Sequence, residues 1–278
     1  MSVAGGIHNA FDAGTRVGCD CLQIFVKNQR QWSVAPLTEA DIEAYRTAEQ
    51  KTGLFPVVAH ATYLLNLASP DASLRRRSID GLILDLRRCA QLGVPYLVLH
   101  PGAHMGQGVR TGIKRIVRSL DAVHKRTQGI NVQILLETTA GQGSSIGHEI
   151  EQLGWIISDT RDPDRLGICV DTCHVFAAGY NIADPQGYER LVADLRRHVT
   201  LERVKCFHVN DSMRECGSRV DRHEHIGKGK IGKAGFAHLV NDPRFTAVPK
   251  ILETPKGTDG RGTDLDKVNL KRLRHLIR

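Results

Sequence analysis

Short apolar runs alternate with longer amphipathic segments along almost the whole chain of 278 residues. Continuous β-branched and leucine-rich runs of this length are typical of strands that are buried on both faces of a sheet. Strands that alternate with helices favour parallel pairing through helical crossovers, which predicts an α/β fold. The apolar runs span residues 21–26, 56–61, 96–101, 132–138, 166–172, 204–211 and 250–254.

Two of the intervening segments show helical patterns. Residues 37–53 have Thr38 near their start and Asp41 three positions after it, which is close to a capping box, and they end at Gly53. Residues 73–93 carry apolar side chains at helical spacing, so one stripe of that helix should face a core.

Seven strands at intervals of roughly 35–45 residues fit a (β/α)8 TIM barrel better than an open six-stranded sheet. An eighth strand would precede the glycines at positions 5 and 6, where only the segment Met1–Val3 remains. We therefore expect a single TIM-barrel domain over residues 1–278 whose first strand is truncated at the N-terminus.

The composition excludes several classes of protein. Hydrophobic residues make up 41% of the chain and charged residues 24%, which is ordinary for a soluble globular protein. No segment approaches the roughly 20 apolar residues that span a bilayer, and the N-terminus has no secretory signal, so we expect no membrane partner. The seven cysteines are then expected to be reduced thiols in the cytoplasm. A net charge of +8 favours a polyanionic partner, with nucleic acid first.

Six consecutive predicted strands each end with a side chain that can bind a metal ion. In a barrel these strand ends converge on one face, where active sites are built. A single histidine in an apolar strand is usually a core residue, but packing does not explain six such side chains at the same structural position. These residues are His60, His100, Glu137, Asp171, His208 and Glu253.

Three further donors lie close to these strand ends. His174 follows Asp171 by three residues, and Asp221 and His223 lie in the long segment after the His208 strand. The nine donors are five histidines, two aspartates and two glutamates, a set that suits zinc or manganese at a catalytic site. Nine ligands are too many for one ion and would serve two or three, with one carboxylate shared.

Such a donor set favours metal-assisted hydrolysis of a phosphoester. Two ions about 4 Å apart can hold a bridging hydroxide and stabilise the attacking and leaving oxygens of a phosphoryl displacement. Metal-dependent sugar isomerisation or epimerisation is an alternative, because it uses the same kinds of ligand in a barrel. A third hypothesis, a DNA-damage binder with purely structural zinc, is disfavoured because structural zinc sites are closed.

The cysteines do not form a structural zinc site. Cys169 and Cys173 lie on a predicted strand and just after it, and no second cysteine pair supports them. We interpret these two thiols as buried packing residues. The same interpretation applies to Cys19, Cys21, Cys89 and Cys206.

The segments that carry these donors resemble the endonuclease IV family, the zinc-dependent apurinic/apyrimidinic endonucleases of base-excision repair. The resemblance covers almost the whole chain, and its most specific segments are GICVDTCHVFAAGY (167–180) and GSRVDRHEHIGKGKIG (217–232). The other matching segments are HATYLLNLASPD (60–71), LHPGAH (99–104), LLETTAGQGSSIG (135–147) and ILETPKG (251–257).

The resemblance implies three zinc ions per chain, with manganese possible in part. It implies that the first zinc is held by His60, His100 and Glu137. The second zinc would be held by Glu137, Asp171, His208 and Glu253, so that Glu137 bridges two ions and counts as the catalytic residue. The third zinc would be held by His174, Asp221 and His223.

The implied reaction is hydrolysis of the phosphodiester 5′ to an abasic site in double-stranded DNA, by hydroxide attack assisted by the three zinc ions. It leaves a 3′-hydroxyl and a 5′-deoxyribose phosphate, and related enzymes also clean blocked 3′ ends. The resemblance assigns insertion into DNA to Arg30, Tyr63 and Leu64, whose side chains can stack on bases or open the helix. The alternative is that Tyr63 and Leu64 cap the barrel rim. We expect a cytoplasmic monomer, associated with the nucleoid when on DNA.

Overall fold

All seven predicted strands are present, each within three residues of its expected bounds. The segment Met1–Val3 forms no strand, and the Met1 ammonium group donates to the Gln23 carbonyl oxygen at 2.5 Å. The parallel strands are β1 (Leu22–Phe25), β2 (Val57–His60), β3 (Tyr96–Leu99), β4 (Gln133–Glu137), β5 (Leu166–Asp171), β6 (Val204–His208) and β9 (Lys250–Ile251).

The computed structural model describes residues 1–278, which divide into two units. Unit 1 comprises residues 1–136 and 156–167, and unit 2 comprises residues 137–155 and 168–278. The single domain expected from the sequence stays a prediction. None of the helices combines the length and apolar character that crossing a membrane requires.

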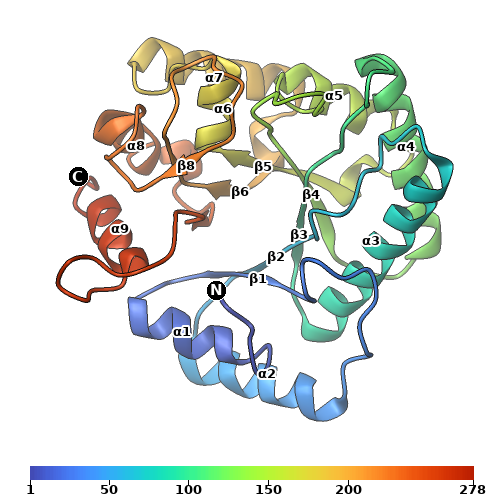
Figure 1. The fold of residues 1–278 in the computed structure, drawn as a ribbon, viewed down its shortest axis with the longest axis horizontal. Coiled ribbons are helices and arrows are strands. Elements are labelled where there is room, and N and C mark those ends of the chain that lie inside the picture. Colours follow the sequence, from blue (N-terminus) through green and yellow to red (C-terminus); the bar gives the residue numbers. More distant parts are fainter. The chain divides into compact units, whose positions relative to one another are not determined.

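Unit 1 is built on the parallel strands β1 to β4, which pair in chain order. Phe25 pairs with His60, and His60 pairs with Val98, so the carboxyl ends of these strands lie together. Helix α1 contacts both α2 and β1, as Figure 1 shows. The helices of this unit are α1 (Asn9–Val17), α2 (Glu39–Thr52), α3 (Ala72–Leu92) and α4 (Val109–Arg126), and α5 (Ile150–Asp159) runs from unit 2 into unit 1.

The helix boundaries expected from the sequence are confirmed. The Thr38 hydroxyl accepts from the Asp41 backbone N–H at 3.1 Å, and the Asp41 carboxylate accepts from the Thr38 N–H at 3.0 Å, which completes the capping box of α2. Gly53 ends α2 in the left-handed region at φ 66°, where a residue without Cβ is favoured. Helix α3 begins after Asp71, whose carboxylate accepts from two backbone N–H groups of its first turn.

A buried ion pair holds the segment that follows β1. The Lys27 ammonium contacts the Asp85 carboxylate on α3, and both side chains are almost fully buried. The Arg88 guanidinium donates to the carbonyl oxygens of Val26 at 2.6 Å and Ala35 at 2.9 Å. Helix α3 therefore fixes both ends of the loop at residues 27–35, which includes Arg30.

Unit 2 contains β6, β9 and residues 168–171 of β5, and β5 is buried at all six of its positions. Cys169 pairs with Cys206, and Asp171 pairs with His208 two positions further along. Because side chains alternate along a strand, these four residues point to the same face of the sheet in two successive layers. The other elements are α6 (Thr172–Ala178), α7 (Pro185–His198), α8 (Gly232–Val240), α9 (Leu265–Arg274) and the antiparallel hairpin of β7 (Asp211–Ser212) and β8 (His223–Glu224).

Short 3-10 helices precede the strands β5, β6 and β9. They span Pro163–Arg165, Leu201–Arg203 and Pro243–Phe245. Arg165, in the first of them, donates to the carbonyl oxygen of His124 at 3.1 Å and to the Thr127 hydroxyl at 3.1 Å. This contact joins the start of β5 to the end of α4 within unit 1.

The buried imidazole of His124 predicts a loss of stability in mild acid. The side chain is 1% exposed, and burial, aided by the Arg165 charge, lowers the pKa of His124 to about 4. The unfolded chain, with an ordinary pKa of 6.5, then binds the proton more readily. The stabilisation is complete above pH 6.5 and is lost as the pH falls towards 4. We expect His124→Gln to reduce the pH 7 to pH 4 change in unfolding free energy by about 3 kcal/mol, measured by urea denaturation.

The matched control for this measurement is His275→Gln, which changes an exposed histidine of α9's C-terminal end. Its pH dependence should match that of the unsubstituted chain. A His124→Gln variant that loses as much stability in acid as the unsubstituted chain would contradict the prediction.

Candidate metal centre

Unit 2 contains seven of the nine predicted metal ligands. They come from the ends of β4, β5 and β6, from the first turn of α6, from the β7–β8 hairpin and from the segment after β9. The structure places them in two adjoining groups of carboxylates and imidazoles. These residues are Glu137, Asp171, His174, His208, Asp221, His223 and Glu253.

The first group gathers around His208. One ligand atom from each of Glu137, Asp171, His208 and Glu253 lies within 4.8 Å of the others. The Nδ1 atom of His208 lies 2.8 Å from Oε1 of Glu137 and 3.2 Å from Oε2 of Glu253. Glu137, Asp171 and His208 are fully buried, whereas the Glu253 side chain is 18% exposed. Glu253 therefore forms the solvent-facing side of this group.

The second group gathers around Asp221. Its Oδ2 atom lies 3.1 Å from Nε2 of His174, and its Oδ1 atom lies 3.3 Å from Nε2 of His223. The Nδ1 atoms of the two histidines lie 2.8 Å from the Thr138 carbonyl oxygen and 3.1 Å from the Glu253 carbonyl oxygen, respectively. An imidazole that donates from Nδ1 to a carbonyl directs Nε2 at the ligand position, which is the usual arrangement of metal-binding histidines.

The spacing of Asp171 and His174 has a local cause. Asp171 ends β5 and also caps α6, because its Oδ1 atom accepts from the His174 backbone N–H at 2.9 Å. The same carboxylate therefore belongs to the first group and fixes the helix turn that carries a ligand of the second group. Its Oδ2 atom also lies 3.7 Å from Nε2 of His223.

The carboxylates stabilise positive charge throughout this centre. Burial alone would lower the pKa of His174, but Asp171 and Asp221 raise it to about 10. Burial would likewise lower the pKa of His223, and the same two carboxylates raise it to about 9. Burial opposes ionisation of Asp221, yet hydrogen bonds from both imidazoles hold the pKa of that carboxyl well below its usual range. Imidazolium protons or divalent cations can supply this positive charge.

Two residues that the sequence reasoning missed orient the ligands. The Asn210 amide nitrogen donates to Oδ2 of Asp171 at 2.7 Å, and its amide oxygen accepts from the Glu253 N–H at 2.7 Å. The Thr138 hydroxyl accepts from the Asp171 N–H at 2.9 Å. Thr138 directly follows Glu137, and Asn210 lies two positions after His208. This closeness in the chain is the only feature of the sequence that points to their role.

The cysteines are all free thiols, and Cys173 lies beside two of the predicted metal ligands. Cys89, Cys169, Cys173 and Cys206 are buried, whereas Cys19 and Cys21 are only partly buried. The sulfur of Cys173 also lies within 4.8 Å of ligand atoms of Asp221 and His223. Burial raises the pKa of the Cys173 thiol.

The remaining two predicted ligands, His60 and His100, lie side by side in unit 1. Their ring centroids are 5.5 Å apart, and the Tyr63 ring lies 5.2 Å from His60 and 5.8 Å from His100. The Nδ1 atom of His60 lies 2.6 Å from the Ala61 carbonyl oxygen, so this imidazole has the same kind of backbone anchor as His174 and His223.

The predicted DNA-contacting residues belong to two joined loops of unit 1. Arg30 is exposed, Tyr63 is 58% exposed and Leu64 is partly buried. The Thr62 hydroxyl donates to the Gln29 carbonyl oxygen, which connects the segment before Tyr63 to the segment before Arg30. The two loops therefore present a guanidinium and a phenol ring from a common support.

Comparison with known proteins decides the family. A family model described as "Xylose isomerase-like TIM barrel" matches residues 11–275. A protein of Chloroflexus aurantiacus named "Probable endonuclease 4" is 51% identical over 277 residues, which cover 100% of this chain and 96% of the relative. The chain belongs to the endonuclease IV family.

Solved structures agree with membership of the endonuclease IV family. The crystal structure of endonuclease IV from Thermus thermophilus has a TM-score of 0.85 and 36% sequence identity, and the match covers 99% of this chain and 96% of that one. A D-tagatose 3-epimerase-like protein matches with a TM-score of 0.72 at 18% identity, over 99% of this chain and 94% of that one, which shows a shared fold alone. The predicted TIM-barrel fold is confirmed.

The contacts of Asn210 predict a specific loss of metal affinity. Asn210→Ala removes the hydrogen bond that orients Asp171 and the one that anchors the Glu253 backbone. We expect metal affinity to fall roughly 10–100-fold, as for other residues that orient metal ligands. The measurement is metal content after equilibration with a graded series of chelator concentrations.

Asn241→Ala is the matched control, because that amide donates to the Ala237 and Leu276 carbonyl oxygens and not to a ligand. Equal metal retention in the two variants would show that Asn210 does not orient the ligands.

Proposed function

We propose that this chain is a DNA-repair endonuclease that hydrolyses the phosphodiester 5′ to an abasic site in double-stranded DNA. The products are a 3′-hydroxyl and a 5′-deoxyribose phosphate, and the same centre would remove blocking groups from 3′ ends. The observation that carries this proposal is the pair of adjoining carboxylate and imidazole groups in a chain 51% identical to a protein named "Probable endonuclease 4". The sugar isomerase or epimerase alternative has less support, because the epimerase-like match is 18% identical.

The donor set fits divalent ions of the zinc type. Imidazole nitrogens directed by backbone carbonyls and carboxylate oxygens are ordinary catalytic zinc ligands, and manganese accepts them in part. In this proposal Glu137, Asp171, His208 and Glu253 hold one zinc ion. A second is held by His174, Asp221 and His223. The assignment of His60 and His100 to a further zinc ion, shared with Glu137, rests on the family resemblance alone.

When bound, the zinc ions would supply a water deprotonated near neutral pH and positive charge beside the phosphate. The chain's own residues hold and orient this centre. Glu137 is fully buried and hydrogen-bonded to His208, so its carboxylate has a fixed position, and we assign it as the catalytic residue. Asp171 is fixed in turn by Asn210 and by the first turn of α6. Such a preorganised centre needs little rearrangement during reaction.

The two joined loops of unit 1 would recognise the damaged duplex. Exposed Arg30 and Tyr63 would stack on bases next to the abasic site, and Leu64 would act as an apolar wedge. Tyr63 also contacts the rings of His60 and His100, so a structural role and a DNA-binding role are compatible. A net charge of +8 favours the polyanionic duplex. We propose that the enzyme acts in the cytoplasm as a monomer and associates with the nucleoid when on DNA.

The first test is cleavage of a duplex with one abasic analogue, with the strands resolved on a denaturing gel. We expect a single cut on the 5′ side that persists when magnesium is chelated and is lost after prolonged zinc stripping. Glu137→Gln should reduce the rate by several orders of magnitude while the circular dichroism spectrum stays unchanged. Glu149→Gln, at an exposed position of unit 2, should cut normally.

The other outcomes separate the alternatives. Binding without cutting would support a DNA-damage binder with structural metal, and neither binding nor cutting would support a sugar isomerase or epimerase. A Glu137→Gln chain that fails to fold would show that this carboxylate is structural.

The loop geometry predicts separate effects on DNA and on metal. Arg30→Ala should weaken binding of the abasic duplex about 10–100-fold, since stacking of one side chain on a base contributes roughly 1–3 kcal/mol. Its zinc content should not change. Arg76→Ala removes the same charge from an exposed position of α3 and serves as the control in a titration followed by fluorescence anisotropy. Equal weakening in both variants would mean that Arg30 contributes only charge.

A further inference from the structure

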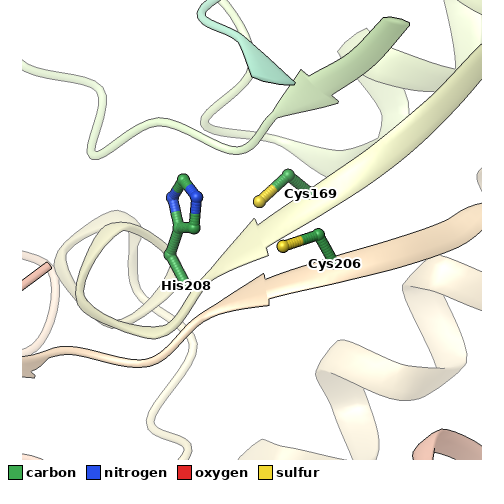
Figure 2. Close-up of side chains that lie close together, drawn as sticks. All are labelled: Cys169, Cys206 and His208. Atoms are coloured by element: carbon green, nitrogen blue, oxygen red, sulfur yellow. The ribbon is translucent and has the colours of Figure 1, made fainter. Parts of the chain in front are cut away.

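Two buried thiols lie directly beside a proposed zinc ligand. Figure 2 shows Cys169 on β5 and Cys206 on β6, with both sulfur atoms on the side of the strands where the His208 ring lies. The two sulfur atoms and a ring nitrogen of His208 lie within 4.8 Å of one another. All three side chains are fully buried.

The register of the sheet creates this arrangement. Cys169 is paired with Cys206, and Asp171 is paired with His208 in the next layer on the same face. The oxygen-rich group of Glu137, Asp171 and Glu253 thus shares His208 with a sulfur-rich group one side-chain layer deeper in the sheet. Oxygen and sulfur donors select different ions, because thiolates favour soft ions and carboxylates favour harder ones.

We propose that Cys169, Cys206 and His208 form a second kind of metal site in unit 2, one that takes a thiophilic ion of the cadmium type. The two sulfurs and the imidazole supply three ligands, which is enough for a partly open site. Because His208 belongs to both groups, an ion held by the sulfurs alters the imidazole that the oxygen-rich group uses. A soft metal ion bound at the sulfur site therefore changes how strongly the oxygen-rich group binds its own ion.

The oxygen-rich layer above the thiols lies nearer to solvent than the thiols do. The side chains of Glu253 and His223 are each 18% exposed, so the oxygen-rich group is open to solvent although the thiols are not. Each thiol that binds the ion releases its proton to solvent, and no oxidant is required. Binding leaves both cysteines in the thiolate state, distinct from the disulfide that oxidation would form.

The test is a titration of the full chain with Cd²⁺, followed by the ultraviolet charge-transfer absorption that arises only from thiolate–cadmium bonds. The Cys216→Ser background removes the exposed thiol, which could bind cadmium by itself. We expect one equivalent of cadmium to produce the band. Cys169→Ser and Cys206→Ser, each in that background, should lose the band or require at least about tenfold more cadmium.

Cys89→Ser is the matched control, because it changes a buried cysteine of unit 1 and should leave the band intact.

The ¹¹³Cd chemical shift of the cadmium-loaded Cys216→Ser chain is a second measurement, and it requires no substitution in the core. Two sulfur ligands move the resonance far from the position of a site with only oxygen and nitrogen ligands. A resonance typical of oxygen and nitrogen ligands alone, or a band that survives in both Cys169→Ser and Cys206→Ser, would overturn the proposal. These readouts do not depend on DNA cleavage, so they can succeed or fail independently of the proposed nuclease activity.

Discussion

The centre of unit 2 depends on one constraint: two of its ionised carboxylates are fully buried, so positive charge and hydrogen bonds must stabilise them. Glu137 and Asp171 lie at strand ends where water does not reach them, and transferring an ionised carboxylate to such a place costs several kcal/mol. The imidazoles of His174, His208 and His223 and the amide of Asn210 offset this cost through direct hydrogen bonds and charge. A site that concentrates negative charge in this way favours bound cations, which is consistent with the proposed zinc ions.

The backbone contributes as much to the centre as the side chains do. Two histidines are held through Nδ1 by carbonyl oxygens, and Asp171 is both a strand end and a helix cap. Ligands fixed in this way lose little freedom when an ion binds, because the strands and the first turn of α6 already define their positions. A D-tagatose 3-epimerase-like protein shares this fold at 18% identity, so the fold by itself does not specify the chemistry.

Features that depend on local pattern can be predicted from the sequence. The seven strands and the Thr38 cap follow from apolar runs and from contacts three residues apart, so neighbouring residues specify them. The donors could be found because a barrel gives every strand end the same structural position. The contacts of Asn210 and the pairing of Cys169 with Cys206 depend on strand register, which distance along the chain does not specify. From the sequence alone Cys169 and Cys206 are therefore indistinguishable from packing residues, because only the register brings both sulfurs close to His208.

A single hydroxyl, that of Thr62, joins the loop of Arg30 to the loop of Tyr63 in unit 1. These two loops are separated in the chain by a helix and a strand, and the hydrogen bond fixes the position of one loop against the other. An insertion in one of them would displace the other, so natural variation in these loops should occur as matched pairs of changes. Under the proposed DNA-binding role of these loops, exchange of damage specificity between family members would require that both segments be transplanted together.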